Sequence, residues 1–174
     1  QNRNPYIQQS GDDLLRLVLF WALFMPWGNF YSWDAKKIRS EIKNYFSIAS
    51  FGYLLLIVSV YLFSAIQKNS PEWRTEGTAI YYALSLDQLK LGMGDWLYQH
   101  PSLMKGLTFF VFYYFEVLVP LLFIIPFKNQ QFRALCVFSI ILLHIGISLN
   151  LYVGLFFIIG ITSSLGLLPS SVMD

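Results

Sequence analysis

Three ionisable residues in or beside apolar stretches are the part of this chain that could do chemistry. Glu116 lies near the middle of a long apolar run, His144 lies in a second run, and Lys68 stands where a third run meets polar sequence. An ionisable side chain in hydrocarbon costs on the order of 3 kcal/mol, so such groups tend to face other helices and find partners there. A carboxylate, an imidazole and an amine that meet could exchange protons with a ligand.

Glu116 and His144 have two interpretations, and both stay open. In the first, the carboxyl group is protonated or hydrogen-bonded to the imidazole, and the pair pins two helices together. In the second, both residues line an outward-opening pocket with Arg16, and aromatic side chains such as Trp73 wall a flat apolar ligand. At about 1.5 Å per residue, Glu116 lies roughly 13 Å and His144 roughly 8 Å below the outer edge of the membrane. Both positions fall in the outer half.

Lys68 and Arg16 also have two interpretations each. A lysine at the end of a span ordinarily anchors the helix at the interface. Desolvation in an apolar pocket would instead favour the neutral amine, which can act as a base. Arg16 either extends to the interface or turns into the bundle to hold an anion. The two histidines and Cys136 do not complete a metal site without distant carboxylates, so no metal is expected.

The composition is that of a membrane protein. Of the 174 residues, 56% are hydrophobic and only 13% are charged, whereas a soluble domain has about a quarter charged. Several apolar runs approach the roughly twenty residues that cross the hydrocarbon layer. We therefore predict an all-α, polytopic protein whose partner is the lipid bilayer. The net charge of +2, without a basic stripe, gives no reason to expect nucleic acid as a partner.

The hydropathy pattern predicts about five spans, in residues 14–30, 45–67, 107–127, 132–149 and 155–168. The first two are joined by a loop that contains Lys36, Lys37, Arg39 and Lys43. The positive-inside rule assigns this loop to the cytoplasm, so the N terminus and residues 68–106 lie outside. Within that outer segment, residues 77–90 are expected to form an amphipathic helix at the interface or over the bundle.

The whole chain, residues 1–174, is expected to form a single membrane domain. It starts at Gln1 without a signal-peptide pattern, although the charge rule places this end outside. We therefore expect that further spans precede it in a longer protein.

The order of several motifs resembles the HTTM family, bacterial membrane proteins related to the membrane core of vitamin K-dependent gamma-glutamyl carboxylase. The similarity covers nearly the whole chain. The matching motifs are SGDDLLR, FWALFMPWG, YSWD, the spacing of Tyr61, Lys68 and Trp73, EGTAIYYAL, FYYFEVLVPLLF with Glu116, and LLHIGISLNLYVGLFF with His144. Each motif is degenerate and apolar, and the ordered combination is the specific signal.

This resemblance implies a function as well as a fold. In the carboxylase, the lysine in the place of Lys68 is regarded as the base that deprotonates vitamin K hydroquinone, before oxygenation and carboxylation of peptide glutamate. The resemblance thus implies that Lys68 is a catalytic base and that His144 orients or polarises the quinol. Gln67 stands where the family commonly has a second lysine. We therefore limit the expectation to a quinone-like or lipid ligand and a carboxylase-like or epoxidase-like use of it, in a bacterial inner membrane.

A different class of function fits the same sequence. In this alternative, the chain is a non-catalytic membrane subunit or anchor that holds a membrane or exoplasmic partner protein. The surroundings of Lys68 distinguish the two readings. Contact with Glu116 or His144 favours chemistry, whereas exposure to lipid headgroups or to another chain favours the subunit.

Overall fold

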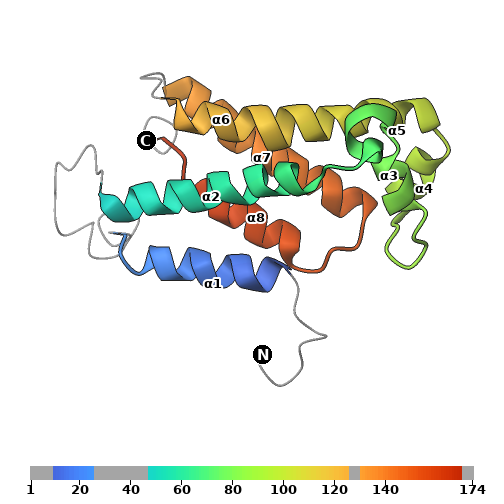
Figure 1. The fold of residues 1–174 in the computed structure, drawn as a ribbon. Coiled ribbons are helices and arrows are strands. Elements are labelled where there is room, and N and C mark those ends of the chain that lie inside the picture. Colours follow the sequence, from blue (N-terminus) through green and yellow to red (C-terminus); the bar gives the residue numbers. More distant parts are fainter. Residues whose placement is uncertain (1–9, 26–46, 126–129, 170–174) are drawn as a thin grey trace.

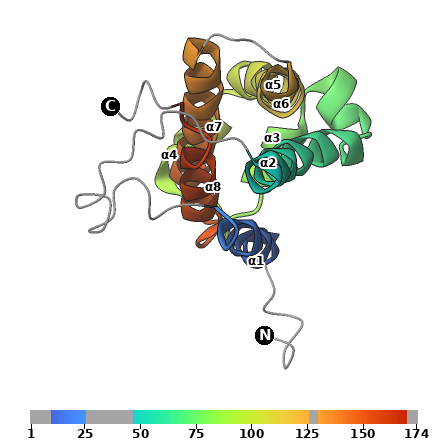
Figure 2. The ribbon, with the colours of Figure 1, turned by 90° about the vertical axis from the view of Figure 1, so that its left-hand side faces the viewer.

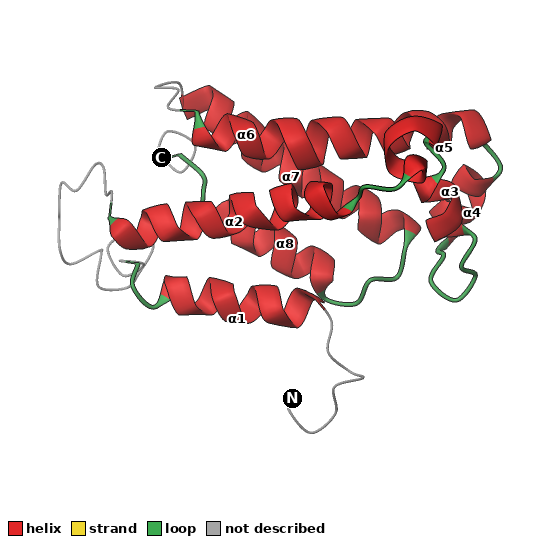
Figure 3. Ribbon diagram, in the orientation of Figure 1, coloured by secondary structure: helices red, strands yellow, loops and turns green. Residues whose placement is uncertain are grey.

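The computed structural model describes residues 10–25, 47–125 and 130–169 (Figure 1). Within these ranges the regular elements are helices, as Figure 3 shows, with one isolated bridge between Lys90 and Leu151. Three helical stretches, Ile48–Gln67, Pro101–Ile124 and Gln130–Asn150, are long and apolar enough to cross a membrane. The prediction of an all-helical chain is confirmed, and a lipid environment is supported.

The helix bounds agree with several of the predicted spans. Helix α2 (Ile48–Gln67) ends where the second span was expected to end, and α7 (Gln130–Asn150) brackets the predicted residues 132–149. The shorter apolar helix α8 (Phe156–Leu165) lies within the predicted residues 155–168. Helix α1 (Ser10–Ala22) begins before the predicted residues 14–30. Residues 26–30 and the basic loop after them lie outside the described ranges.

The third predicted span, residues 107–127, begins too late. The helical stretch starts at Pro101, six residues before the predicted start. Proline suits the first turn of a helix because its fixed backbone angle is helical and the N–H that it lacks would have no helical partner there. His100, the residue before this proline, is the last residue outside the helix.

The long helices lie side by side and run in alternating directions. Figures 1 and 2 show α1, α2 and the continuous stretch from Pro101 to Ile124 running roughly along one axis, with α7 and α8 tilted across them. Helix α7 packs most extensively against α8, while α1 contacts both α2 and α8. The core between them is formed largely by apolar side chains, including Tyr53, Ile57, Phe115, Val119, Val137, Ile140 and Leu143.

The stretch from Pro101 to Ile124 contains a wide turn in its middle. Helix α5 (Pro101–Phe109) continues into the π-helix η4 (Phe110–Leu118) and then into α6 (Val119–Ile124). Pro120 has no N–H, and its ring would collide with the carbonyl of residue 116 in a regular α-helix. The π-helix ends next to this proline, with the Val119 N–H bonded to the Tyr114 carbonyl. Glu116 therefore lies in a segment whose backbone is wider than an α-helix.

Short elements form a cap at one end of the bundle (Figure 1). They are η3 (Glu72–Glu76), α3 (Ala79–Leu84) and α4 (Gly92–Tyr98). Leu84, Leu97 and Met104 form a second apolar core beneath them. The cap is tied to the end of α7 because the Leu91 N–H donates to the Asn150 carbonyl at 2.9 Å and the Tyr152 N–H donates to the Leu89 carbonyl at 2.7 Å.

The predicted amphipathic helix of residues 77–90 is shorter than expected. Helix α3 ends at Leu84, where the Ser85 hydroxyl donates to the Tyr82 carbonyl at 2.7 Å. A serine that bonds the preceding turn in this way competes with continuation of the helix. The following residues form a turn whose end, at residues 89–91, pairs with residues 150–152.

A substitution in α4 tests the junction between the cap and α7. A Cβ atom at Gly94 would collide with the backbone carbonyl oxygen of Asn150, which cannot move as a side chain can. We expect Gly94→Ala to lower the stability by about 1–3 kcal/mol, the usual cost of overpacking. The matched control is Gly92→Ala, two residues away, where a Cβ would have no neighbour within 4 Å. Thermal unfolding in detergent micelles compares the two, and equal stabilities would contradict the junction.

Candidate functional site

An ion pair joins the end of α2 to the middle of η4. The Lys68 ammonium contacts the Glu116 carboxylate at Oε1, and the two side chains are only 23% and 8% exposed. Lys68 caps the C terminus of α2, with its N–H bonded to the Ser64 carbonyl. A cation is favoured at that end of a helix because the last carbonyls carry partial negative charge. The sequence-predicted residues Lys68 and Glu116 are therefore in direct contact.

Ser64 and Trp73 also contact the ion pair. The Ser64 hydroxyl donates to Glu116 Oε1 at 3.3 Å. On the other side, Lys68 Nζ lies 4.2 Å from the centre of the Trp73 ring. A cation over an indole face is attracted by the ring's electron density, and the attraction grows when water is excluded. The structure thus brings Trp73, a predicted pocket residue, to the predicted base.

His144 packs against the face of α2 that carries Lys68, about two helical turns earlier along α2, where it contacts Tyr61. Its ring is 2% exposed, and Nε2 lies 2.9 Å from the Tyr61 hydroxyl. Tyr61, Ser64 and Lys68 are spaced by three and four residues, so they share one face of α2. The imidazole packs against Phe156, with ring centres 5.3 Å apart. Gly160 on α8 makes room for the ring, because a Cβ there would overlap it.

The suggested hydrogen bond between Glu116 and His144 is absent. Glu116 bonds Lys68 and Ser64, whereas His144 bonds Tyr61. The physical reason is that α2 lies against both helices and supplies a separate partner to each buried group. Three buried side-chain atoms have no hydrogen-bond partner among the described residues: Glu116 Oε2 and His144 Nδ1 at this site, and Asn150 Oδ1 at the end of α7.

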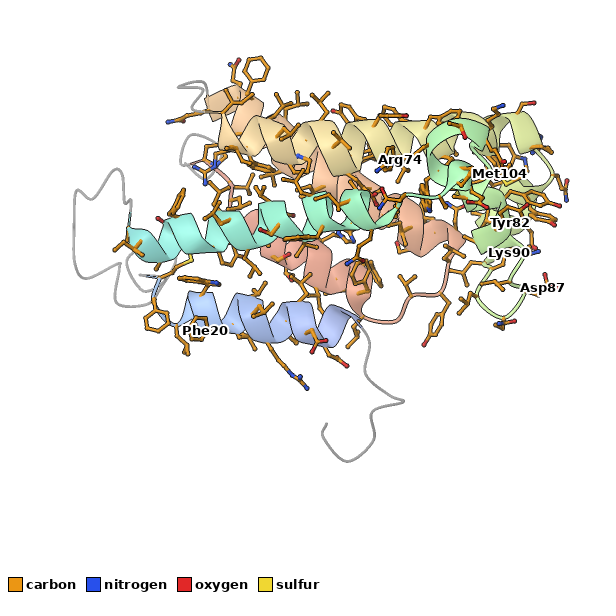
Figure 4. The ribbon with its side chains drawn as sticks, viewed as in Figure 1. Phe20, Arg74, Tyr82, Asp87, Lys90 and Met104 are labelled. Carbon is orange, nitrogen blue, oxygen red and sulfur yellow. The ribbon has the colours of Figure 1, made fainter. Side chains whose placement is uncertain are left out.

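Arg74 holds the segment over the ion pair. Its Nε donates to the Lys68 carbonyl at 3.1 Å, and its guanidinium lies 5.7 Å from the centre of the Phe112 ring. The Tyr113 hydroxyl donates to the Arg74 carbonyl at 3.2 Å. Figure 4 shows Arg74 beside the stretch that contains η4, near the cap. Helix η3 is therefore held against both α2 and η4 by the interactions of Arg74.

Arg16, the remaining predicted pocket residue, has a different setting. It forms an ion pair with Asp13 on the same helix at 3.1 Å, and its side chain is 44% exposed. Its place in a ligand pocket stays a prediction. In residues 10–25, 47–125 and 130–169, no three His, Cys, Asp or Glu side chains gather in a way that could hold a metal ion.

Three contacts were not predicted from the sequence. Ser64 bonds Glu116, Arg74 bonds the Lys68 carbonyl, and Tyr61 bonds His144. Ser64 and Tyr61 could have been found by following one helical face back from Lys68, in steps of three and four residues. The contacts of Arg74 could not be found from helical spacing, because they depend on how η3 folds back over η4.

No protein-family model, curated protein or solved structure matches this chain. The family resemblance therefore remains a proposal, and the site is judged on its geometry.

The arrangement can hold and move protons. A partly buried amine in contact with a buried carboxylate can exist as an ion pair or, after one proton shift, as a neutral pair, because low polarity reduces the advantage of separated charges. The adjacent tyrosine and histidine form a second proton-carrying pair. Together, Lys68 and Tyr61 of α2, Glu116 of η4 and His144 of α7 place four proton-exchanging groups near the C-terminal end of α2, and Glu116 and His144 each carry an atom without a hydrogen-bond partner.

The ion pair can be tested by removing one partner and then both. We expect Lys68→Met to lower the free energy of unfolding by about 3–5 kcal/mol, because it leaves the Glu116 carboxylate buried without a counter-ion. The double variant Lys68→Met/Glu116→Gln should regain most of this loss. Unfolding in mixed micelles, followed by tryptophan fluorescence, measures both. A single variant as stable as the unaltered protein would contradict the pair.

The fit of His144 against α8 can be tested at Gly160. We expect Gly160→Ala to displace the imidazole, break its bond to Tyr61 and cost about 1–3 kcal/mol. The nitrogen chemical shifts of His144, measured in a His100→Gln background, should change with it. Gly146→Ala is the control, since a Cβ there has no neighbour within 4 Å. Unchanged His144 shifts in Gly160→Ala would show that the contact is not present.

Proposed function

We propose that this chain is an HTTM-like integral membrane protein that binds a quinone-like ligand beside Lys68, Glu116 and His144 and accepts a proton from its reduced form. The single observation that carries the proposal is the contact between the partly buried Lys68 and the buried Glu116, beside two polar atoms without hydrogen-bond partners. A ligand hydroxyl or carbonyl group is of the right polarity to meet Glu116 Oε2 and His144 Nδ1, whose burial without partners is costly.

The residues present suit such a ligand. Trp73 and Phe156 supply flat apolar surfaces beside Lys68 and His144 respectively. Apolar sites with a few convergent polar groups are typical of small-molecule binding. A quinone head group combines a flat ring with two oxygens, and its reduced form carries two hydroxyl groups.

The pair would accept the proton by either of two equivalent routes. Glu116 can take it directly while the Lys68 ammonium stays beside the oxygen that lost it. Alternatively, Lys68 first passes a proton to Glu116 and then takes the ligand's proton as a free amine. Both routes end with an ammonium and a protonated carboxyl group, so the atoms balance identically. Water exclusion strengthens the attraction of the ammonium for the new negative charge.

The membrane arrangement belongs to the same proposal. The bundle crosses a bacterial inner membrane about five times, with α1 and α8 completing the three long helices, and the N terminus of this chain outside. Helix length supports three of these crossings, by α2, the Pro101–Ile124 stretch and α7, and the basic character of the predicted inner loops supports the orientation. The cap and Lys68 then lie on the outer side, which agrees with the exoplasmic site of the carboxylase that the chain resembles.

Mass spectrometry of the purified protein tests the function directly. We expect quinones to copurify with the unaltered protein, and Lys68→Met/Glu116→Gln to retain at least about tenfold less, since a charge-assisted hydrogen bond is worth about 1.5–3 kcal/mol. Lys105→Ala, which removes an exposed lysine outside the site, should retain the normal amount. The same samples, supplied with vitamin K hydroquinone, should bind it in the same order.

The opposite result has a definite meaning. If the unaltered protein holds no quinone even after saturation, or if the double variant retains it equally, then the site is a structural pin between helices. The chain would then be a non-catalytic subunit or anchor, and cross-linking in membranes would be the means to find its partner protein.

A further inference from the structure

The outer side of α4 and the turn before it expose large apolar side chains. Met93 and Trp96 are 52% and 56% exposed, and Leu86 and Leu89 in the turn are exposed as well. Met93 and Trp96 are three residues apart in one helix, so they share a face. These four residues are called the cap surface below.

The reverse side of α4 is fixed against the bundle. Leu97 is buried with Leu84 and Met104 in the second core, and Gly94 lies against the Asn150 carbonyl. Helix α4 therefore cannot rotate to bury Met93 and Trp96 without breaking this packing. Their exposure is a consequence of how the cap is held.

The charges of the cap are gathered away from this apolar face. Lys90 Nζ bonds Asp87 at 3.0 Å and Asp95 at 3.1 Å. Asp95 lies roughly 160° around α4 from Met93, counted at 100° per residue. The hydrogen bond to Asp87, and after it the bond to Asp95, raises the pKa of Lys90 above its ordinary value, so the charged ammonium form is favoured. Figure 4 shows Lys90 and Asp87 together at this end of the molecule.

The cap surface is continuous with surfaces that face the hydrocarbon. Helix α5 starts three residues after α4 ends and exposes Leu103, and Phe110 is exposed in η4. On the other side, Leu89 is bonded to Tyr152, just beyond α7, which exposes Leu149. The cap surface thus begins at the level where the lipid-facing sides of two long helices end.

We infer that the cap surface inserts into the interfacial layer of the bilayer at this end of the bundle, with Met93 and Trp96 among the lipids. Tryptophan is favoured at this depth because its ring is apolar and its N–H can reach water or headgroups. Lipid is the occupant that follows from continuity, since the neighbouring exposed side chains of α5 and α7 already belong to membrane-crossing helices. The cap then lies in the membrane interface beside the end of α2.

Spin labels on single cysteines test this placement in the whole chain. In a Cys136→Ala background, nitroxide labels are placed at Met93→Cys and Trp96→Cys, in vesicles of phosphatidylcholine and phosphatidylglycerol. Asp87→Cys is the control, since this residue is 89% exposed and lies on the charged side. Collision rates with oxygen, which partitions into lipid, and with a water-soluble nickel chelate report the depth of each label. Circular dichroism checks that every variant is folded.

We expect the labels at positions 93 and 96 to collide more with oxygen than with nickel, and the label at position 87 to show the reverse. If positions 93 and 96 are as accessible to nickel as position 87, the cap stands in water and the inference is wrong. If both labels are immobilised and shielded from oxygen and nickel alike, a protein covers the surface instead. Measuring the labels at several protein-to-lipid ratios would show whether that protein is a second copy of the chain.

Discussion

Lys68 and Glu116 carry opposite charges into a bundle whose other buried side chains are apolar or weakly polar, and this contact constrains how the helices pack. Neither charge can be left alone in hydrocarbon, so α2 and η4 have to meet at this level. Once they meet, the same face of α2 directs Tyr61 toward His144 on α7. Helix α8 then needs a glycine, Gly160, at the place where it passes the imidazole. The ion pair between Lys68 and Glu116 thus constrains how η4, α7 and α8 pack around α2.

The backbone of η4 is adapted to the same contact. Pro120 prevents a regular helical bond in the turn that carries Glu116, and the widened backbone changes the direction of side chains before it relative to those after it. A regular α-helix with the same sequence would rotate Glu116 relative to Phe112 and Phe115, which are buried with it. The position of one carboxylate therefore depends on a proline one turn further along the chain.

The sequence was sufficient for the helices and insufficient for their rotation about their axes. Long apolar runs determine where spans lie, and the ends of α2 and α7 agree with those predicted. Both helices are apolar on nearly every side, so periodicity does not indicate which face is inside. For that reason the sequence left open whether Glu116 meets His144 or Lys68, and the structure pairs Glu116 with Lys68 and His144 with Tyr61. The predicted start of the third span is late for a simpler reason: the first turns of α5 contain polar residues, so their hydropathy resembles that of an outer loop.

A helix pin and a proton-accepting site make different demands on hydrogen bonding. A pin is most stable when every buried polar atom has a partner, because a half-satisfied polar network is worse than an apolar contact. Here Glu116 Oε2 on η4 and His144 Nδ1 on α7 are both buried without a hydrogen-bond partner among the described residues. Leucine at position 116 and phenylalanine at position 144 would avoid that cost. A polar group of the proposed ligand beside these two atoms would remove that cost, whereas packing of the helices alone leaves it.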